Sequence, residues 1–491
     1  MTRLSKKAGI TTMGKKSAKK KEKPGARADA HGRGKVATSG KKKKQPAVLT
    51  EEQIKMITQR RKITKAILEK QKSLEKEREK KKKEKEKEKK KKAGHPAAIE
   101  DLFSEKKKTK KKDKHKAEDR EKKAKKEGKK EKESGVILPA SWEKLEGYVP
   151  PQLEKVADRV LDHYDLKPKS RVVVATKPLK GGAIWQVTTE KGRHYSLKLL
   201  HRRPERSLFS IWAQEYLVKK KARVPAFLPT KDDRLYVEMG NKLWIVCEWI
   251  ESLREATKDL KGAQAICYGL GEFHRLSRGY QPPAEAEYSS RLRRWPDYYE
   301  KIITKFGWFR RLGEAYRDTP AGPELLKALA VFEKQAHEGL ARLQRSPYAR
   351  LAARGESYWG LAHQDYGWGN AQIGPGGVWI IDLDGVVFDL PIRDLRKLIS
   401  SCMDEKWDLQ WVKGMISAYH KANPIEPDLY EVFLIDLAMP NEFYQFIKEV
   451  VYDPVTFLNA GTKNELTRMI QREKSKRSVL AALSDWKVGK E

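Results

Sequence analysis

The sequence predicts an α+β fold with two lobes, a small antiparallel β lobe followed by a large helical lobe. Three observations support this fold class. Residues 171–249 contain five short runs rich in β-branched and aromatic residues, with a helical segment after the third run. From about residue 262 onward, apolar residues recur mostly at helical spacing. Residues 1–135 form a Lys-rich tail whose composition differs from that of both lobes.

The net charge of the chain is concentrated in this tail. The 491 residues include 106 Lys and Arg against 67 Asp and Glu, a formal net charge of +39. Residues 1–135 hold 51 of the basic and 21 of the acidic side chains and so contribute +30. They contain one aromatic residue, Phe103, whereas all 13 Trp come later. Because such a segment cannot bury enough apolar surface to offset chain entropy, we expect it to be disordered or locally helical.

A charged helix is predicted within the tail at residues 51–92, where no Gly or Pro interrupts the chain. We expect this helix to be solvated, and a coiled-coil partner is the alternative. Its thin apolar stripe consists of Met56, Ile63, Ile67 and Leu74.

The tail as a whole should bind polyanions through counterion release, with little sequence discrimination. Anionic polymers or surfaces, acidic proteins and, without sequence specificity, nucleic acids are eligible partners of residues 1–135. Base reading is not supported, because the tail lacks interleaved aromatic residues.

The remainder of the chain has the composition of a water-soluble protein. Its three cysteines, Cys247, Cys267 and Cys402, lie far apart and predict neither a disulfide framework nor a metal site. We expect reduced core cysteines in a protein made in the cytosol. We also expect no membrane span, because no apolar run reaches about 18 residues, and no standard export signal at the N-terminus.

The small lobe is expected to contain five strands and a helix in the order three strands, helix, two strands. Gly240 and Asn241 between the last two strands are typical of a hairpin turn. A short amphipathic segment at residues 150–164 precedes the lobe. The expected strands are 171–176, 183–189, 194–200, 234–239 and 242–249, and the expected helix is 207–220.

Lys198 lies in the middle of the third strand, on the face opposite Leu197 and Leu199 if the residues alternate. A Lys in this place can reach the α and β phosphates of a nucleotide when a carboxylate from the next helix holds it. Glu215, in that helix, is the natural candidate. A solvent-facing Lys is the alternative.

Two further segments of the small lobe are candidates for nucleotide contacts. Gly181 and Gly182 would let backbone amides approach a phosphate, although an ordinary turn explains a Gly-Gly pair equally well and the run is not GxGxxG. The hinge between the lobes, where backbone groups would contact adenine, would consist of Glu248, Trp249 and Ile250.

The stretch HQDYGWGN, His363 to Asn370, carries the strongest functional signal. An Asp, an Asn five residues later and a second Asp ending an apolar run form the arrangement with which kinases hold magnesium nucleotide and receive a hydroxyl proton. Asp365 would accept or orient that proton, and His363 would orient the loop unless it is a buried structural residue. Asn370 and Asp382 would bind Mg²⁺.

Asp384 follows in the same IDLDG run. It would ligate a second metal or cap the turn before Gly385, and the turn is slightly favoured. The order of strand, helix and motif predicts a bilobal protein kinase-like fold with ATP and Mg²⁺ as cofactors. We expect a small lobe at residues 136–250 and a helical lobe at residues 251–491.

Several longer stretches resemble the CotS family of spore coat proteins, a branch of the aminoglycoside phosphotransferase and choline kinase group of kinase-like folds. The resemblance covers roughly residues 140–490 and implies deposition in the spore coat after synthesis in the mother-cell cytoplasm. It also implies that Asp394 supports the active site rather than acting as a catalyst. The matching stretches are HQDYGWGN, VWIIDLDGVVFDLPIRDLRKLI, SAYHKANP, FLIDLAMPNEFY, SLFSIWAQEYL and LGEFHRLSRG.

Three functional hypotheses follow. The first is an ATP- and Mg-dependent phosphotransferase acting on a hydroxyl of a coat protein or a small molecule. The second is a catalytically inactive coat component that keeps the kinase fold, and the third is a polyanion-binding surface protein that acts through its tail. Residues 291–302, RLRRWPDYYEKI, predict a solvated amphipathic helix, and recognition of an acidic or phosphorylated acceptor is the alternative.

Overall fold

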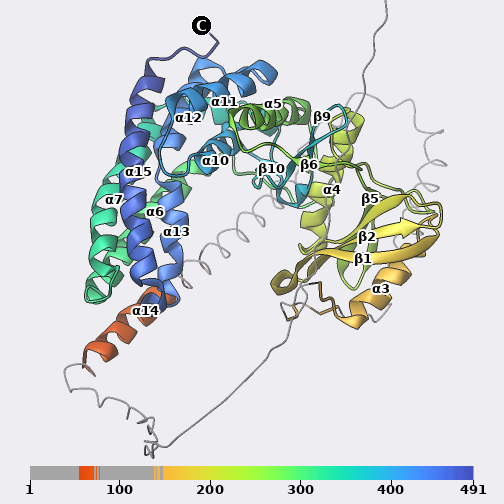
Figure 1. The fold of residues 1–491 in the computed structure, drawn as a ribbon, viewed down its shortest axis with the longest axis horizontal. Coiled ribbons are helices and arrows are strands. Elements are labelled where there is room, and N and C mark those ends of the chain that lie inside the picture. The colour runs from red at the N-terminus through yellow and green to blue at the C-terminus, as the bar shows by residue number, and fades with distance from the viewer. Residues whose placement is uncertain are drawn as a thin grey trace, which may run out of the picture. The chain divides into compact units, whose positions relative to one another are not determined.

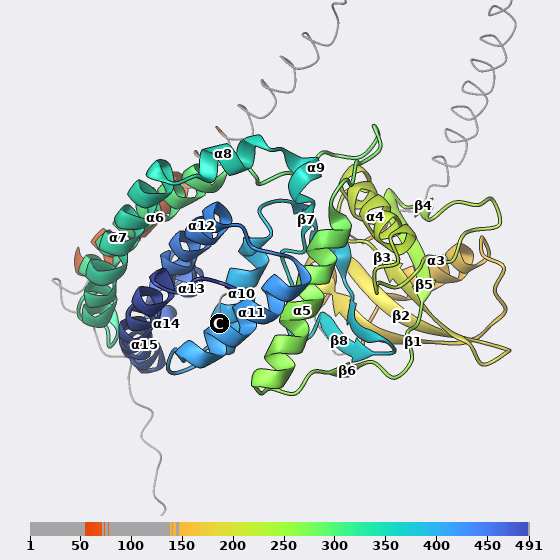
Figure 2. The same ribbon diagram turned by 90° about the horizontal axis from the view of Figure 1, so that it is seen from above.

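The computed structural model describes residues 55–70, 73, 77, 138–139, 141–143 and 147–489. A small antiparallel sheet with flanking helices is joined to a larger, mainly helical lobe (Figures 1 and 2). The predicted α+β fold class with a small β lobe and a large helical lobe is therefore confirmed.

The small lobe contains a five-stranded antiparallel sheet in the order β1-β2-β3-β5-β4. Gly240 and Asn241 both have positive φ, 65° and 57°, as the predicted hairpin turn between β4 and β5 requires. All five predicted strands are present, with ends shifted by a few residues. Their bounds are β1 Pro168–Lys177, β2 Gly182–Thr189, β3 His194–Leu199, β4 Val237–Met239 and β5 Lys242–Glu248.

Two helices cover the two faces of this sheet. Alternating residues of β5 point to opposite sides, so Trp244 packs with α3 (Pro151–Leu161) and Ile245 packs with α4 (Pro204–Lys219). Trp244 also stacks on Trp185, with ring centroids 5.7 Å apart. Burial on both faces fixes the register of β3 and thereby the direction of Lys198.

The large lobe is built mainly from helices, with α11 lying along α5 (Figure 2). Its helices are α5 Leu260–Ser277, α6 Trp295–Ala315, α7 Gly322–Arg345, α8 Tyr348–Ala353, α9 Glu356–Trp359, α10 Ile392–Cys402, α11 Leu409–Ala422, α12 Pro427–Ala438, α13 Asn441–Ile447, α14 Pro454–Phe457 and α15 Ala460–Ser484.

Short strands and 3₁₀ turns complete the topology and frame the site. The predicted strand pair around residues 371–381 forms the hairpin of β8 and β9. The remaining elements are β6 Arg254–Glu255, β7 Leu361–Ala362, β8 Ala371–Gly374, β9 Gly377–Ile380, β10 Val387–Phe388, η1 Pro178–Lys180, η2 Leu383–Gly385 and η3 Lys448–Val451.

The predicted helix at residues 291–302 is only partly correct. Helix α6 begins at Trp295, so the basic residues Arg291, Arg293 and Arg294 precede it. Trp295 and Tyr299 are buried, with exposed fractions of 1% and 0%, so this end of α6 is not a solvated helix.

All three cysteines are free thiols, as predicted, and Cys247 and Cys267 are buried. Burial raises the pKa of Cys247 to about 12, which keeps its thiol protonated. Within the part of the chain that the structure describes, no helix combines the length and apolarity needed to cross a bilayer.

The tail helix differs from the prediction of a solvated rod. Residues 55–70 are helical, and Ile67 is 5% exposed within the core cluster of the large lobe. Ile63 and Leu68 are partly buried against the same cluster. Two residues of the predicted apolar stripe, Ile63 and Ile67, are therefore covered, whereas Met56 is 44% exposed. The rest of the predicted helix lies outside the described residues, apart from two positions.

Polar contacts hold this helix against the end of α6. Arg60 donates from Nε to the Ala315 carbonyl at 2.7 Å and forms an ion pair with Asp318. Its guanidinium lies 4.9 Å from the centroid of the Tyr316 ring, whose hydroxyl is 3.3 Å from Thr64 Oγ1. Sequence periodicity could identify the stripe but not its partner, because α6 is about 250 residues away.

Ile67→Asp should release this helix from the large lobe. A carboxylate at a buried apolar position costs several kcal/mol unless the helix undocks. Hydrogen exchange monitored by mass spectrometry should show at least a tenfold loss of protection across residues 58–70. Met56→Asp is the matched control, because Met56 is 44% exposed and its variant should exchange like the wild type. Unchanged protection in Ile67→Asp would mean that the docked helix does not depend on this contact.

Candidate active site

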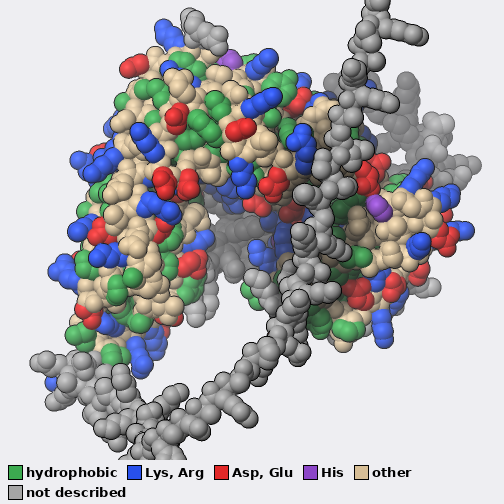
Figure 3. All heavy atoms as spheres, in the orientation of Figure 1, with side chains coloured by type: hydrophobic (Ala, Val, Ile, Leu, Met, Phe, Trp, Pro, Cys, Tyr) green, Lys and Arg blue, Asp and Glu red, His purple; other side chains and the backbone are tan. Residues whose placement is uncertain are grey.

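Three segments meet between the two lobes. They are β3 with Lys198, the loop of residues 363–370 between β7 and β8, and residues 381–385 after β9. Ile381 links the last two segments, because its N–H donates to the Asn370 carbonyl at 3.0 Å and its own carbonyl lies 3.1 Å from His363 Nε2. Figure 3 shows Lys and Arg together with Asp and Glu side chains in the hollow between the lobes.

The loop exposes Asp365 and fixes its neighbours. Asp365 is exposed, and its N–H donates to His363 Nδ1 at 3.3 Å. Asn370 donates from Nδ2 to the Asp365 carbonyl at 2.8 Å and to its carboxylate at 3.4 Å. Three predicted site residues are thereby brought together. His363 itself is fully buried, so its contacts position the loop and do not reach a substrate. Burial lowers the pKa of its imidazole and favours the neutral form.

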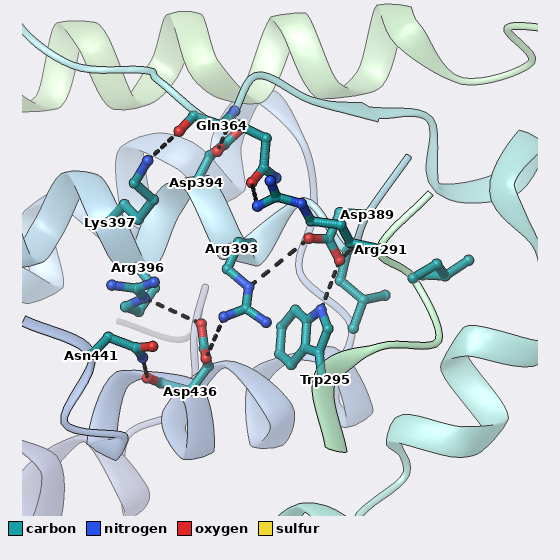
Figure 4. Close-up of polar contacts among 12 residues, drawn as sticks. Arg291, Trp295, Gln364, Asp389, Arg393, Asp394, Arg396, Lys397, Asp436 and Asn441 are labelled. Atoms are coloured by element: carbon teal, nitrogen blue, oxygen red, sulfur yellow. Dashed lines mark hydrogen bonds and ion pairs between the residues drawn. The ribbon is translucent and has the colours of Figure 1, made fainter. Parts of the chain in front are cut away.

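Asp394, in the first turn of α10, fixes the backbone of this loop through hydrogen bonds. Its carboxylate accepts the N–H group of Gln364 (Figure 4). It also accepts the N–H group of His363 and lies 3.3 Å from His274 Nε2. Burial by itself would raise the pKa of Asp394, but the hydrogen bond from His274 and nearby positive groups outweigh burial and lower the pKa to about 2. Gln364 has a φ of 71°, an uncommon backbone conformation that these contacts maintain.

Lys198 reaches two carboxylates at the end of β9. Its Nζ lies 2.7 Å from an oxygen of Asp382 and 2.7 Å from an oxygen of Asp384. Burial would lower the pKa of Lys198, but the two carboxylates raise it. Burial would likewise raise the pKa of Asp382, and Lys198 and Lys177 lower it. Lys198 and Asp382 are therefore both charged at neutral pH.

The predicted pairing of Lys198 with Glu215 is wrong. Glu215 forms an ion pair with Lys219, one turn further along α4, at 3.1 Å. The beginning of α4 faces the site, because Arg206 bonds to the Val386 carbonyl next to η2. Glu215 lies nine residues beyond Arg206, which is about 13 Å along a helix. Lys198 does lie within β3, but its acidic partners come from the other lobe.

Asp384 is part of a turn but also contacts Lys198 together with Asp382, and these two residues are called here the acidic pair. It lies in η2 and is 7% exposed. One oxygen contacts Lys198, and the other faces His201 Nδ1 at 3.7 Å without a hydrogen bond among the described residues. Asp382 has a φ of 59°, a strained conformation for a residue other than Gly. That backbone turn directs both carboxylates to one lysine.

The loop next to this acidic pair contributes Lys177, which the sequence did not single out. Lys177 Nζ lies 3.2 Å from Asp382 Oδ2. After it, η1 ends at Gly181, whose φ of 65° suits a glycine. Gly182 starts β2 beside His201, and a Cβ there would lie 2.9 Å from that of His201. The two predicted glycines therefore allow a tight turn next to the acidic pair.

The predicted hinge residues lie at the end of β5. Glu248 donates its N–H to the Ala226 carbonyl at 2.9 Å, and Trp249 donates to the His194 carbonyl at 3.4 Å. Both backbone donors are thus used within the protein, and Ile250 follows directly.

The donor set suits magnesium bound together with a nucleotide. In the described part of the chain, no group of three or more His, Cys, Asp or Glu residues is arranged to hold a metal alone. Asp382, Asp384 and the amide oxygen of Asn370 would supply two carboxylates and one neutral oxygen. Mg²⁺ typically uses one or two carboxylates and completes its coordination with phosphate oxygens and water. The unpartnered Asp384 oxygen fits such a ligand.

Comparison with known proteins agrees with this geometry. Residues 177–432, more than half of the chain, match the phosphotransferase enzyme family, so the chain belongs to that family. It is 26% identical over 336 residues to spore coat protein S of Bacillus subtilis (strain 168), covering 68% of this chain and 95% of that protein. The resemblance inferred from the sequence motifs is thereby confirmed.

A solved structure supports the fold. An aminoglycoside phosphotransferase from Alicyclobacillus acidocaldarius subsp. acidocaldarius DSM 446 is 18% identical with a TM-score of 0.56. The match covers 70% of this chain and 97% of that protein. The kinase-like fold predicted from the order of strand, helix and motif is therefore correct.

Proposed function

We propose that this chain is a spore coat protein that transfers a phosphoryl group from Mg-ATP to a hydroxyl of a coat protein or a small molecule. One observation carries the proposal, namely the convergence of Lys198, Asp365, Asn370 and Asp382 between the lobes. The similarity to spore coat protein S supports the coat assignment. We further propose synthesis in the mother-cell cytoplasm, as the CotS resemblance implies.

Each converging residue has a role in this reaction. Asp365 would orient the acceptor hydroxyl and take its proton, and its exposed position leaves room for an acceptor. Lys198 would move from the carboxylates to the α and β phosphates. Asn370, Asp382 and Asp384 would hold Mg²⁺, whose charge offsets that of the phosphates. Gly181, Gly182 and the hinge of residues 248–250 would contact the remainder of ATP.

An inactive scaffold is the main alternative. Two points favour it, because the glycine loop is not GxGxxG and Lys198 lacks its expected helix partner. Against it, Asp382 and Asp384 place two like charges beside each other in a largely buried place. Lys198 and Lys177 compensate for these charges, and a pure scaffold has no need for such a group of buried charges.

Polyanion binding by the tail is compatible with either function of the folded part. Residues 1–135 carry +30 of the formal net charge of +39 and would attach the protein to anionic polymers or surfaces. We propose three parts for the chain, namely this tail, a small lobe at residues 136–250 and a helical lobe at residues 251–491.

Phosphorylation of a spore extract tests the proposed transfer. Wild-type protein with radiolabelled Mg-ATP should label an extract component, and Asp365→Asn should reduce the rate at least 100-fold because the hydroxyl loses its base. Asp404→Asn, an exposed acid elsewhere in the large lobe, should retain the wild-type rate. Equal labelling by wild type and Asp365→Asn would contradict the proposal, and labelling by neither would favour the scaffold.

A further inference from the structure

Four basic side chains near the loop of residues 363–370 and the start of α4 form no described ion pair. In the described structure, none of them has a carboxylate within ion-pair distance, unlike Arg393 and Arg396, which both pair with Asp436. Arg206 is buried and Arg202 and Lys397 are partly buried, whereas Arg291 is exposed. A buried or partly buried charge without a partner is costly, so such groups usually have a ligand or a counter-charge. The four residues, called here the basic cluster, are Arg202, Arg206, Arg291 and Lys397.

Two members of the basic cluster hold Gln364, the residue before Asp365. Arg291 Nη1 donates to the Gln364 side-chain oxygen, and Lys397 Nζ donates to its backbone carbonyl (Figure 4). Arg291 comes from the segment before α6 and Lys397 from α10, so two separate elements bring positive charge to the same loop. Each of these bonds uses one donor and leaves further N–H donors on both side chains.

The other two members lie at the start of α4. Arg206 is 9% exposed and donates from Nη2 to the Val386 carbonyl. The backbone N–H of Arg291 donates to the Phe388 carbonyl at 2.8 Å, two residues beyond Val386. Both arginines therefore bond to the same short segment, residues 386–388. Burial and the nearby charge of Arg202 lower the pKa of Arg206 to about 10, and Arg291 acts in the same direction.

The basic cluster and Gln364 have more buried hydrogen-bond donors than acceptors. Arg202 Nε, Arg206 Nη1 and Gln364 Nε2 are buried donors without a partner among the described residues. Such donors are rare in folded proteins and call for a ligand or water. Asp389 is a nearby acid with one unpartnered oxygen, and its direct contacts are with Trp295 and Arg393. Burial lowers the pKa of Arg291, and the charge of Asp389 offsets that effect in part without an ion-pair contact.

We propose that the basic cluster binds a phosphate or carboxylate group of the phosphate acceptor. The acceptor would then carry its reacting hydroxyl toward Asp365 and its anionic group toward Arg291 and Lys397. Guanidinium groups bind such planar or tetrahedral oxyanions through paired N–H donors. The anion site stands on the contacts alone, whereas its assignment to the acceptor rests on the proposed phosphotransferase function.

Thermal unfolding of the full-length chain in sodium phosphate and in sodium chloride of equal ionic strength tests the anion site. Phosphate should raise the Tm of the wild type more than chloride does, because a ligand that binds only the folded state stabilises it. Arg291→Gln and Lys397→Met should lose most of that difference. The Lys-rich tail is identical in all variants, so its own anion binding cancels. Sodium acetate replaces phosphate in a parallel series, which separates a carboxylate site from a phosphate site.

Arg294→Gln is the matched control, because Arg294 is exposed like Arg291 and lies three residues from it in the same segment, whereas the described contact with Gln364 is made by Arg291. It should retain the full phosphate effect. Equal effects of phosphate in the wild type, Arg291→Gln and Lys397→Met would overturn the proposal, as would the absence of any effect of phosphate or acetate on the wild type. Arg291 precedes α6 and Lys397 lies in α10, so if one of the two variants fails to fold, the other still tests the proposal.

Two further measurements separate this proposal from the proposed function. Mg-ATP affinity, measured by calorimetry, should stay within twofold of the wild type in Arg291→Gln, whereas labelling of the spore extract should fall at least tenfold. If the wild type binds phosphate but not Mg-ATP, the proposed phosphotransferase activity is contradicted and the anion site is supported. Labelling of the extract by Arg291→Gln at the wild-type rate would contradict the proposal that the basic cluster binds the phosphate acceptor.

Discussion

Asp382→Asn should weaken Mg-ATP binding at least 100-fold. The substitution keeps the shape of the side chain but removes the negative charge that faces Lys198 at 2.7 Å and Lys177 at 3.2 Å. In the proposed complex this carboxylate binds Mg²⁺ between the phosphates, and an amide is a much poorer ligand for that ion. Isothermal titration calorimetry of the full-length protein measures the change directly.

The control for this variant is Asp404→Asn, which alters an exposed carboxylate outside the site. It should bind Mg-ATP like the wild type. Wild-type protein that fails to bind Mg-ATP, or Asp382→Asn that binds it as tightly as the wild type, would show that the acidic pair does not form a nucleotide site. The Lys198 contact would then be only a structural link between the lobes.

Asp436→Ala should destabilise the large lobe by about 3–5 kcal/mol, the usual cost of removing one partner from a buried ion pair. Asp436 is fully buried, with its two oxygens 3.1 Å from Arg393 and 3.2 Å from Arg396 (Figure 4). It also accepts a hydrogen bond from the Tyr299 hydroxyl at 2.7 Å. Two buried arginines would lose their shared counter-charge. Urea unfolding at pH 7 measures the free energy of unfolding.

Asp428→Ala, on the same helix, is the control. Its side chain is 36% exposed and pairs with exposed Arg350 at 2.6 Å, so the expected cost is below about 1 kcal/mol. A similar loss of stability in both variants would mean that helix α12, rather than the buried ion pair, is sensitive to substitution.

The pH dependence of stability gives a second check on Asp436. Burial would raise the pKa of this carboxyl, but Arg393 and Arg396 outweigh burial and lower it. A lowered pKa contributes stability above the unfolded pKa of about 3.9 and loses it as the pH falls toward the folded value. The difference in unfolding free energy between the wild type and Asp436→Ala should therefore narrow below about pH 4. A constant difference from pH 7 to pH 3 would contradict the assignment.

Local sequence patterns predicted the elements of the small lobe well. The strand around Lys198 and the hairpin at Gly240 and Asn241 depend on alternation and on residues that tolerate positive φ, and both are properties of neighbouring residues. The spacing from Asp365 to Asn370 was equally informative, because a single loop between two short strands carries both side chains.

Contacts between distant residues were predicted less well. Glu215 was chosen for Lys198 from its position in the following helix, but the rotation and length of α4 direct it to Lys219. The tail helix was expected to be solvated, yet Ile67 packs in the large-lobe core. Neither partner could be inferred from spacing, because both depend on how separate elements pack together.

The sequence by itself determined the order of strands and helices in the small lobe, the spacing of Asp365, Asn370 and Asp382, and the concentration of net positive charge in residues 1–135. Hydrophobic periodicity and short motifs carry that information because they act over a few residues. Only the tertiary structure decided that Lys198 joins Asp382 and Asp384 and that Arg291 and Lys397 meet at Gln364. These pairs lie far apart along the chain, and burial of the surrounding apolar surfaces brings their charges together.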